Sequence, residues 1–249
     1  MLGLGSNISK LPTSGATIVT DNLVLRHDYT LKPVQPLSDG AALFDAATEF
    51  IACGNDTSLD LTSDMTIMAW VNPTTAGQNA HIAGRDNGSL RNYTLYVNGN
   101  RFYYGYFVGG SEKKVGSSTA DTANTWVHLT ATRDRTGDAS VMYVNGVNED
   151  ADDDGTDAID NDDYQFTIGA RYASAASFAG LICNVGLWSR ALTQAEIKSI
   201  MWKNYSQLNA NEVGNLVSWW NLDVETATDG TAGSGGVKDY NSTNHGTLT

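Results

Sequence analysis

Cysteine, proline and long apolar runs are scarce in this chain of 249 residues. The two cysteines, Cys53 and Cys183, lie in the apolar runs EFIACG and LICNVGLW, which argues against a disulfide framework and predicts two buried, reduced thiols. One bridge between them is the alternative. The 4 Pro, beside 25 Gly, suit a chain with many tight turns. No segment approaches the ~18 consecutive apolar residues of a membrane span, so we expect no membrane partner.

Basic residues are also few, with 15 Lys and Arg against 28 Asp and Glu and a formal net charge of −13. Nucleic-acid binding needs a basic face that displaces phosphate counterions, so we expect no nucleic-acid partner. The opening stretch MLGLGSNISKLPTSG lacks the basic and apolar regions of a signal peptide. We therefore expect a protein made in a cytoplasm and not exported by such a signal.

Short β-rich runs separated by turn signals fill residues 42–190 and predict a β-sandwich or barrel. YVNG occurs at 96–99 and at 143–146, and its Asn-Gly pair predicts a type I′ hairpin turn each time. In the run TWVHLTATR, apolar and polar residues alternate. This alternation predicts one packed face and one wet face, with His128 on the wet face.

A single helix is predicted at residues 193–208, where Thr193 and Glu196 have the spacing of a capping box. Its apolar stripe should pack on the sandwich and consists of Ile197, Ile200, Met201 and Leu208. These patterns divide the chain into an N-terminal arm (1–20), a domain (21–210), and a C-terminal strand with a Gly/Ser-rich tail (211–249).

The stretch DADDDGTDAIDN at residues 150–161 begins like a calcium-binding loop. Its twelfth position, Asn161, offers one amide oxygen where the motif needs a bidentate carboxylate. Two interpretations remain open, a solvated acidic loop and a calcium site. The candidate calcium ligands are Asp150, Asp152, Asp154 and Asp160.

Aromatic residues cluster in RFYYGYFVGG and LVSWWNL, and exposed aromatic side chains of this kind stack on sugars or anchor protein interfaces. The candidates are Tyr104, Tyr106, Trp219 and Trp220. The alternative is that most of them are core residues, because a sandwich buries one side of each strand. Alternation places Tyr104 and Tyr106 on one face, opposite Tyr103 and Phe107.

Three segments in order carry a family resemblance: GAALFDAATEFIACGNDTSLDLTSDMTIMAWVNP, WVHLTATRDRTGDASVMYVNGV and FAGLICNVGLWSRALTQAEI. Together they resemble the LamG-like (concanavalin A-like) jelly-roll family. The resemblance implies an all-β fold of two antiparallel sheets in a jelly-roll sandwich, with one short α-helix on the C-terminal side. Family members bind sugars, bind proteins or are purely structural, so the resemblance implies no activity.

Catalytic motifs are missing. Glycoside hydrolases of similar fold carry a Glu-x-Asp-x-x-Glu strand that this chain lacks, and it has no Gly-x-Ser-x-Gly or His-Glu-x-x-His motif. We therefore expect a protein that is not an enzyme, without catalytic residues or a required cofactor. Calcium-binding family members often carry an acidic residue just after F-x-G-x-I, where this chain has Cys183 and Asn184.

The sequence is compatible with two functions. The opener MLGLGS, the acidic charge and the closing WWNLD and NHGTLT segments are similar to LamG-like virion proteins of tailed bacteriophages. They suggest a capsid decoration (cement) or tail-associated protein, located in the virion, whose partners are major capsid or tail proteins and copies of itself. The alternative is a glycan-binding, lectin-like module, with or without calcium.

A similar sequence segment occurs twice, once near each end of the chain. NLVLRHDYTL at 22–31 and NLVSWWNLDV at 215–224 are both versions of a segment that often begins domains of this family. One sandwich cannot use both at the same strand position. We expect Trp219 and Trp220 to anchor the second copy to the sandwich, and residues 1–20 or 225–249 to contact another subunit.

Overall fold

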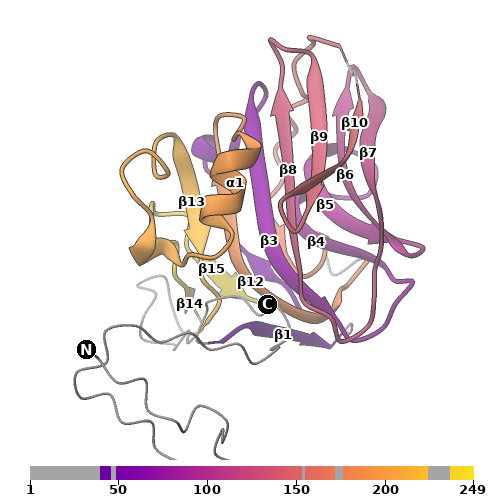
Figure 1. Ribbon diagram of the computed structural model, residues 1–249, viewed down its shortest axis with the longest axis vertical. Helices are drawn as coiled ribbons and strands as arrows, with labels where there is room; N and C mark the ends of the chain where they lie inside the picture. Colours follow the sequence, from indigo (N-terminus) through magenta and orange to yellow (C-terminus); the bar gives the residue numbers. More distant parts are fainter. Residues whose placement is uncertain (1–39, 46–48, 153–154, 172–175, 224–235) are drawn as a thin grey trace, which may run out of the picture. The chain divides into compact units, whose positions relative to one another are not determined.

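The computed structural model describes residues 40–45, 49–152, 155–171, 176–223 and 236–249. These residues form two antiparallel sheets that face each other across one core, with a short helix against one of them (Figure 1). The predicted all-β jelly-roll sandwich is confirmed. The predicted arm at 1–20 and the first repeat at 22–31 lie outside the described residues.

Sheet A has seven strands. Its path runs β1 (Ala42–Asp45), β12 (Ala179–Trp188), β3 (Met65–Pro73), β8 (Val127–Asp134), β9 (Ala139–Val144) and β10 (Val147–Asp152), and β13 (Leu216–Trp220) also pairs with β12.

Sheet B has eight strands. Its order is β14 (Gly236–Val237), β15 (Gly246–Leu248), β2 (Ile51–Ala52), β11 (Thr167–Ile168), β4 (Asn79–Asp86), β5 (Arg91–Asn98), β6 (Arg101–Val108) and β7 (Ser111–Ala120). The core fills the space between the two sheets with the inward side chains of both, because successive strand residues point to opposite faces. A short 3₁₀ helix, η1 (Thr57–Leu59), precedes β3.

Both Asn-Gly hairpins form, but with different registers. In the β9–β10 turn, Asn145 and Gly146 have φ of 51° and 73°, as a type I′ turn requires. In the β5–β6 turn, Asn98 still pairs with Arg101, and Gly99 (57°) and Asn100 (86°) take the positive φ values. The turn is therefore one residue later than predicted, with glycine at its first central position.

Helix α1 (Gln194–Ile200) is shorter than the predicted 193–208, and the 3₁₀ helix η3 (Tyr205–Gln207) follows it. The capping box between Thr193 and Glu196 is present as predicted. Ile197 and Ile200 are buried against the outer face of sheet A, where they join a second apolar cluster with Trp188. Figure 1 shows the helix lying across the strands of this sheet.

The prediction of a solvent-exposed face on β8 is wrong, because the segment that carries α1 covers that face of sheet A. His128 is fully buried, and its ring lies 5.1 Å from that of Trp70. The Trp70 indole in turn donates a hydrogen bond of 2.7 Å to the carbonyl of Met201 at the end of α1. Both faces of β8 are thus covered, one by the core and one by the helical segment.

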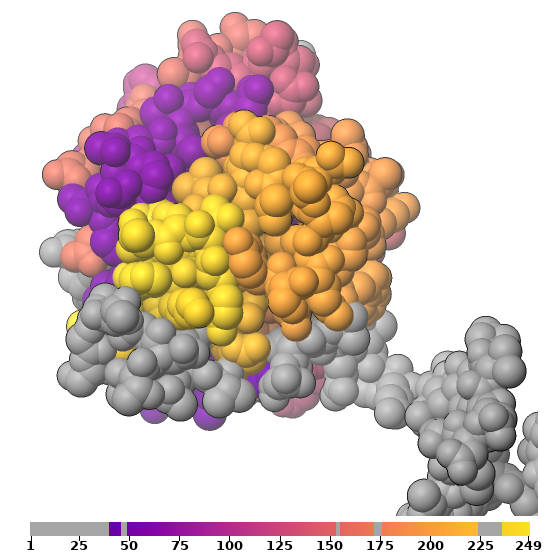
Figure 2. Space-filling model, turned by 90° about the vertical axis from the view of Figure 1, so that its left-hand side faces the viewer, coloured from indigo at the N-terminus to yellow at the C-terminus, as the bar shows by residue number. Residues whose placement is uncertain are grey.

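The C-terminal segment belongs to the sandwich. β13 pairs with β12, and β15 pairs with β2 in the other sheet, so the body of the domain extends beyond the predicted boundary at residue 210. Phe50 and Thr249 exchange backbone hydrogen bonds of 3.3 and 2.9 Å. Figure 2 shows the last residues (yellow) packed between the early strands (indigo) and the segment that carries α1 (orange). Residues 236–249 are therefore a structural part of this sandwich, and contact of residues 1–20 or 225–249 with another subunit stays a prediction.

Candidate functional site

The four aromatic residues predicted as a binding surface are core residues. Tyr104, Tyr106, Trp219 and Trp220 are each 0% exposed, so they present no platform to a ligand. Tyr104 and Tyr106 do share a face, with ring centroids 5.1 Å apart, but it is the inner face of sheet B. The two tryptophans anchor β13, since the Trp220 indole donates to the Asn244 carbonyl at 2.9 Å.

Three of the four predicted calcium ligands lie in the described part of the chain, and they form no metal-binding cluster among themselves. Asp150 and Asp152 lie in strand β10, and Asp154 is outside the described residues. The Asp150 carboxylate accepts from the Gly116 amide at 3.1 Å. The Asp160 carboxylate instead accepts from two consecutive amides, those of residues 109 and 110, each at 2.8 Å.

Arginine side chains organise the acidic segment. Arg133 donates to the carbonyls of Gly155 and Asp157, and Arg135 donates to that of Thr156 at 2.6 Å. Carbonyl oxygens of this kind are what calcium would require, and here guanidinium groups occupy them. Among the described residues, no group of three His, Cys, Asp or Glu side chains could hold a metal ion. A calcium site at this stretch stays a prediction, since Asp154 is not described.

Partly exposed aromatic side chains lie instead on the outer face of sheet B, the face turned away from the core. Tyr103 and Phe107 alternate with the buried Tyr104 and Tyr106 along β6, so they point outward. Tyr103 stacks on its cross-strand neighbour Tyr96, with ring centroids 5.3 Å apart and planes 19° apart. No described helix lies over this face, but much of it is still covered: His81, Thr94 and Tyr96 are buried, and only Tyr103 and Phe107 of these aromatic side chains are partly exposed.

Cations flank the two stacked rings. The Arg91 guanidinium lies 4.9 Å from the Tyr96 ring centroid and 5.9 Å from that of Phe107, and the Lys114 ammonium lies 5.6 Å from that of Tyr103. Such contacts stabilise a cation over an aromatic ring by about 0.5–1 kcal/mol at exposed sites and by more where the pair is desolvated, as the buried Arg91 and Tyr96 are. The outer face therefore alternates aromatic rings with cationic groups.

Two glycines make room for this arrangement. A Cβ atom on Gly116 would lie 2.6 Å from Cε1 of Tyr103, and one on Gly105 would lie 3.0 Å from Cε1 of Tyr96. Both rings thus lie flat over glycine positions of the neighbouring strands. A larger residue at Gly116 would push the Tyr103 ring off the sheet.

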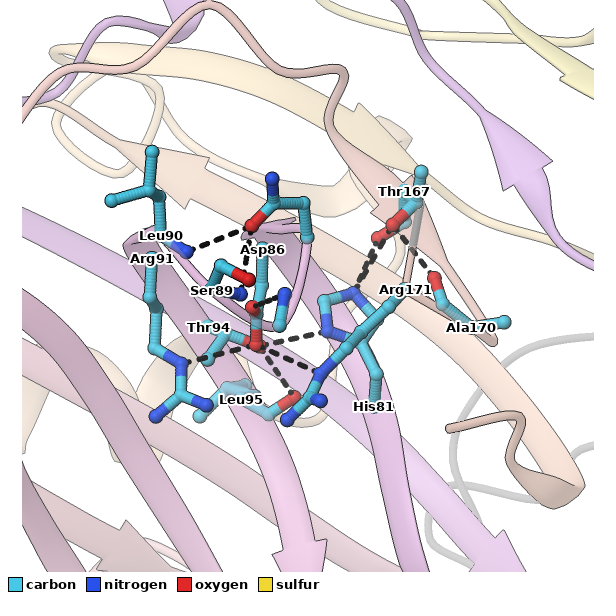
Figure 3. A network of polar contacts seen from close by, with 12 residues as sticks. His81, Asp86, Ser89, Leu90, Arg91, Thr94, Leu95, Thr167, Ala170 and Arg171 are labelled. Carbon is cyan, nitrogen blue, oxygen red and sulfur yellow. Dashed lines mark hydrogen bonds and ion pairs between the residues drawn. The ribbon is translucent and has the colours of Figure 1, made fainter. Parts of the chain in front are cut away.

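Asp86, at the end of β4, is the centre of the polar network in Figure 3. Its Oδ2 accepts from Nε of Arg91 at 3.0 Å and from Nε of Arg171 at 3.1 Å, and its Oδ1 accepts from the Gly88 amide at 2.7 Å. Arg91 also pairs with Glu112 of β7. Both carboxylates of this face are thus ion-paired with Arg91, an arrangement that holds the arginine side chains in place.

Charge keeps Asp86 ionised despite its burial. Desolvation alone raises the pKa of its carboxyl. The charges of His81, Arg91 and Arg171 lower this pKa by a larger amount, so it lies below the ordinary value of an aspartate. Desolvation lowers the pKa of the Arg91 guanidinium, but the attraction of Asp86 outweighs it, so the pKa of Arg91 is raised.

His81 is a neutral connector between β4, β5 and β11. Burial lowers the pKa of its imidazole to about 4, so the ring is uncharged near pH 7. Its Nε2 lies 3.2 Å from the Thr167 carbonyl, which can only accept, so Nε2 carries the proton. Its Nδ1 then accepts from the Thr94 hydroxyl at 2.9 Å.

An open depression of about 240 Å³ lies beside this network and shares Tyr96 and Arg171 with it. The remaining lining residues are Asn79, Ala80, Val97, Asn98 and Ala176. Amide, phenol and guanidinium groups supply both donors and acceptors in a small space next to aromatic surface. This combination suits a ligand rich in hydroxyl groups.

The sequence of residues 45–198 matches the family described as the concanavalin A-like lectin/glucanases superfamily. The chain belongs to this superfamily. No protein with a curated description matches it. No helix among the described residues is long and apolar enough to cross a membrane.

Solved structures of similar fold include a candidate carbohydrate-binding protein from Bacteroides ovatus, with 23% identity and a TM-score of 0.66. That match covers 86% of this chain and 59% of the other, so the chain spans about three fifths of the Bacteroides protein. The binding domain of Paraclostridial Mosquitocidal Protein 1 matches at 13% identity and a TM-score of 0.54, covering 66% of this chain and 46% of that one. At these identities the likeness concerns the fold.

Proposed function

We propose that this domain is a non-enzymatic module that binds carbohydrate on the outer face of sheet B. The observation that carries the proposal is the Tyr96–Tyr103 stack beside the depression that Asn98 and Arg171 line. An aromatic surface beside amide and guanidinium groups offers a sugar both apolar contact and directional hydrogen bonds.

The rigidity of this face supports a binding role. Asp86 holds Arg91 and Arg171 in place before a ligand arrives, so little side-chain entropy is lost on binding. The carbohydrate-binding description of the Bacteroides structure is in line with this proposal.

Glycan-array screening followed by titration calorimetry tests the proposal. Wild-type protein should bind a saccharide, and Tyr103→Ala and Asn98→Ala should each weaken binding by about fivefold, because each removes one contact worth ~1 kcal/mol. Trp202→Ala is the matched control, since Trp202 is an exposed aromatic residue beyond α1 on the other side of the sandwich. Binding lost in Trp202→Ala but retained in Tyr103→Ala would place the ligand elsewhere and overturn the proposal.

We also propose that the module acts within a bacteriophage particle, as a capsid decoration or tail-associated protein located in the virion. The resemblance of the opener MLGLGS, the acidic charge and the closing WWNLD and NHGTLT segments to LamG-like virion proteins supports this role. Purified particles should contain the protein at a fixed stoichiometry measured by quantitative mass spectrometry, with many copies for a decoration protein. Its absence from particles would contradict the proposal and leave carbohydrate binding unaffected.

A further inference from the structure

The outer face of sheet B is cationic, although the chain as a whole has a formal net charge of −13. Among the described residues, four cationic side chains belong to this face together with the carboxylates of Asp86 and Glu112, while the carboxylates of Glu149 and Asp150 bind amides of β7 at its edge. The four are Arg91, Arg101, Lys114 and Arg171. Acidic residues therefore dominate the chain, but not this surface.

Arg101 belongs to this face by strand register. It pairs with Asn98, which lines the depression, and it shares the outward parity of Tyr103 along β6. Its side chain is exposed. Arg101 does not line the depression itself, but strand register places it directly beside Asn98, on the same face and at the β5–β6 edge of the depression.

Arg171 places a second guanidinium in the lining itself. The Arg171 Nε donates to Asp86, which fixes the orientation of the guanidinium. The Arg171 side chain is 25% exposed and lines the depression. The Asp86 carboxylate is 0% exposed, with Oδ1 on the Gly88 amide and Oδ2 on two arginines. A ligand in the depression therefore meets the guanidinium groups and not the buried carboxylate.

We propose that the depression selects acidic saccharides, those that carry a carboxylate or a sulfate group. The anionic group would lie between Arg171 and Arg101, with the Asn98 amide beside it and the sugar ring toward Tyr103. Charge-assisted hydrogen bonds to guanidinium are about twice as strong as neutral ones, which gives the preference its source. The excess negative charge elsewhere on the chain does not oppose this, because exposed charges beyond about 8 Å are largely screened at physiological ionic strength.

This inference rests on the proposed carbohydrate binding and names its ligand class. Matched ligands separate the two. A hexuronic acid oligosaccharide is compared with its carboxyl-reduced form, and a sulfated oligosaccharide with its desulfated form, by titration calorimetry at low and high ionic strength. At least one acidic ligand should bind about tenfold tighter than its neutral counterpart, and the difference should shrink at high salt.

Charge-removing variants locate the effect. Arg171→Gln and Arg101→Gln should each weaken binding of the acidic ligand by about tenfold and change binding of the neutral form little. Lys198→Gln, which makes the same charge change on the exposed side of α1, should leave both unchanged. Because Arg171 also supports Asp86, the exposed Arg101 variant gives the deciding result if Arg171→Gln unfolds at a lower temperature.

Three outcomes would overturn the inference. Equal affinity for acidic and neutral forms would leave a carbohydrate-binding module without charge selection. An equal loss in Lys198→Gln and Arg101→Gln would show an effect of overall charge and not of this site. Failure of every saccharide to bind would remove the proposed function together with the inference.

Discussion

Asp86 is the residue on which the geometry of the outer face depends, since one carboxylate orients two arginines from different segments. We expect Asp86→Asn to lower the free energy of unfolding by about 3 kcal/mol, because the substitution leaves Arg91 charged, mostly buried and without its Asp86 partner. Urea denaturation followed by circular dichroism at pH 7 measures the change. Asp157→Asn, the same change at an exposed position, should stay within about 0.5 kcal/mol of wild type. Equal effects of the two variants would contradict this role for Asp86.

Buried histidines make stability depend on pH. Desolvation lowers the pKa of His128 to about 3 and that of His81 to about 4, whereas an unfolded histidine titrates near 6.5. Between these values the unfolded chain binds protons that the native protein does not, so the free energy of unfolding falls as pH drops below about 6.5. Above that pH the two histidines are neutral in both states, and the free energy of unfolding keeps its full value. We expect each histidine to contribute a loss on the order of 3 kcal/mol by about pH 4.

The variant His128→Gln isolates one of these titrations. Its free energy of unfolding, measured by urea denaturation from pH 7 to pH 4.5, should decline less steeply than that of wild type. The reason is that one proton-uptake step of the unfolded chain has been removed. An unchanged slope would mean that His128 takes up its proton in the native protein as readily as in the unfolded chain.

The alternation of side chains along β6 explains why the residues of the candidate site were only partly predictable from the sequence. Alternation in RFYYGYFV correctly separates Tyr104 and Tyr106 from Tyr103 and Phe107. Both sets are aromatic, so composition alone does not tell which set faces the core. The Asp86–Arg171 contact joins positions 85 residues apart, and no local pattern announces it.

At the scale of single elements, the start of α1 was predictable and its end was not. The capping box depends on residues three apart, Thr193 and Glu196, so sequence spacing reveals it. The helix ends after Ile200, where the Met201 carbonyl instead accepts from the indole of Trp70 on β3. A contact from a distant strand thus competes with the continuation of a favourable helical pattern.

The cap itself can be tested. Thr193→Ala should destabilise the protein by about 1 kcal/mol, because the Glu196 amide loses its side-chain acceptor. Thr193→Ser keeps the hydroxyl and should stay close to wild type. Thermal unfolding followed by circular dichroism compares the three proteins, and equal midpoints for Thr193→Ala and Thr193→Ser would show that the cap contributes nothing.

The C-terminal strands are the second test at this scale. Truncation after Asp223 removes β14 and β15, so that β2 loses a paired neighbour and the Trp220 indole loses its acceptor at Asn244. We expect a large drop in the unfolding midpoint or the loss of a cooperative transition. The single variant Asn244→Ala loses hydrogen bonds to Ser58 and Ser218 and should cost about 1–2 kcal/mol. A truncated protein as stable as wild type would restore the idea of a detachable tail.

Composition misleads in this segment for a physical reason. NSTNHGTLT reads as a polar, low-complexity tail, but its order comes from backbone pairing with β2 and from buried contacts of Asn244. Backbone pairing leaves little trace in residue types.

For the molecule as a whole, family resemblance predicted the two-sheet architecture, while the strand order within each sheet was not readable from the sequence. β12 lies between β1 and β3, which are more than one hundred residues away along the chain. The same long-range arrangement separates the two cysteines, because Cys53 follows β2 in sheet B and Cys183 lies within β12 in sheet A. The strands β2 and β12 therefore do not pair with each other.

Thiol reactivity should therefore report opening of the whole sandwich. Both cysteines are buried as thiols, and desolvation, with a smaller contribution from Asp239, raises the pKa of Cys53 well above its ordinary value. We expect almost no reaction with a disulfide reagent in native protein and two thiols per chain in denaturant without a reductant. Rapid native labelling would show local opening near the cysteines, and a denatured count of zero would show a disulfide.

The proposed binding surface lies mostly on one uninterrupted meander, from β4 to β7. Its outward positions include Tyr96, Asn98, Arg101, Tyr103 and Lys114, and the intervening positions belong to the core. Randomising only the outward codons leaves the buried half of each strand untouched. The domain should therefore serve as a display scaffold, in which a single short cassette is diversified and selected against new ligands while the rest of the sandwich stays constant.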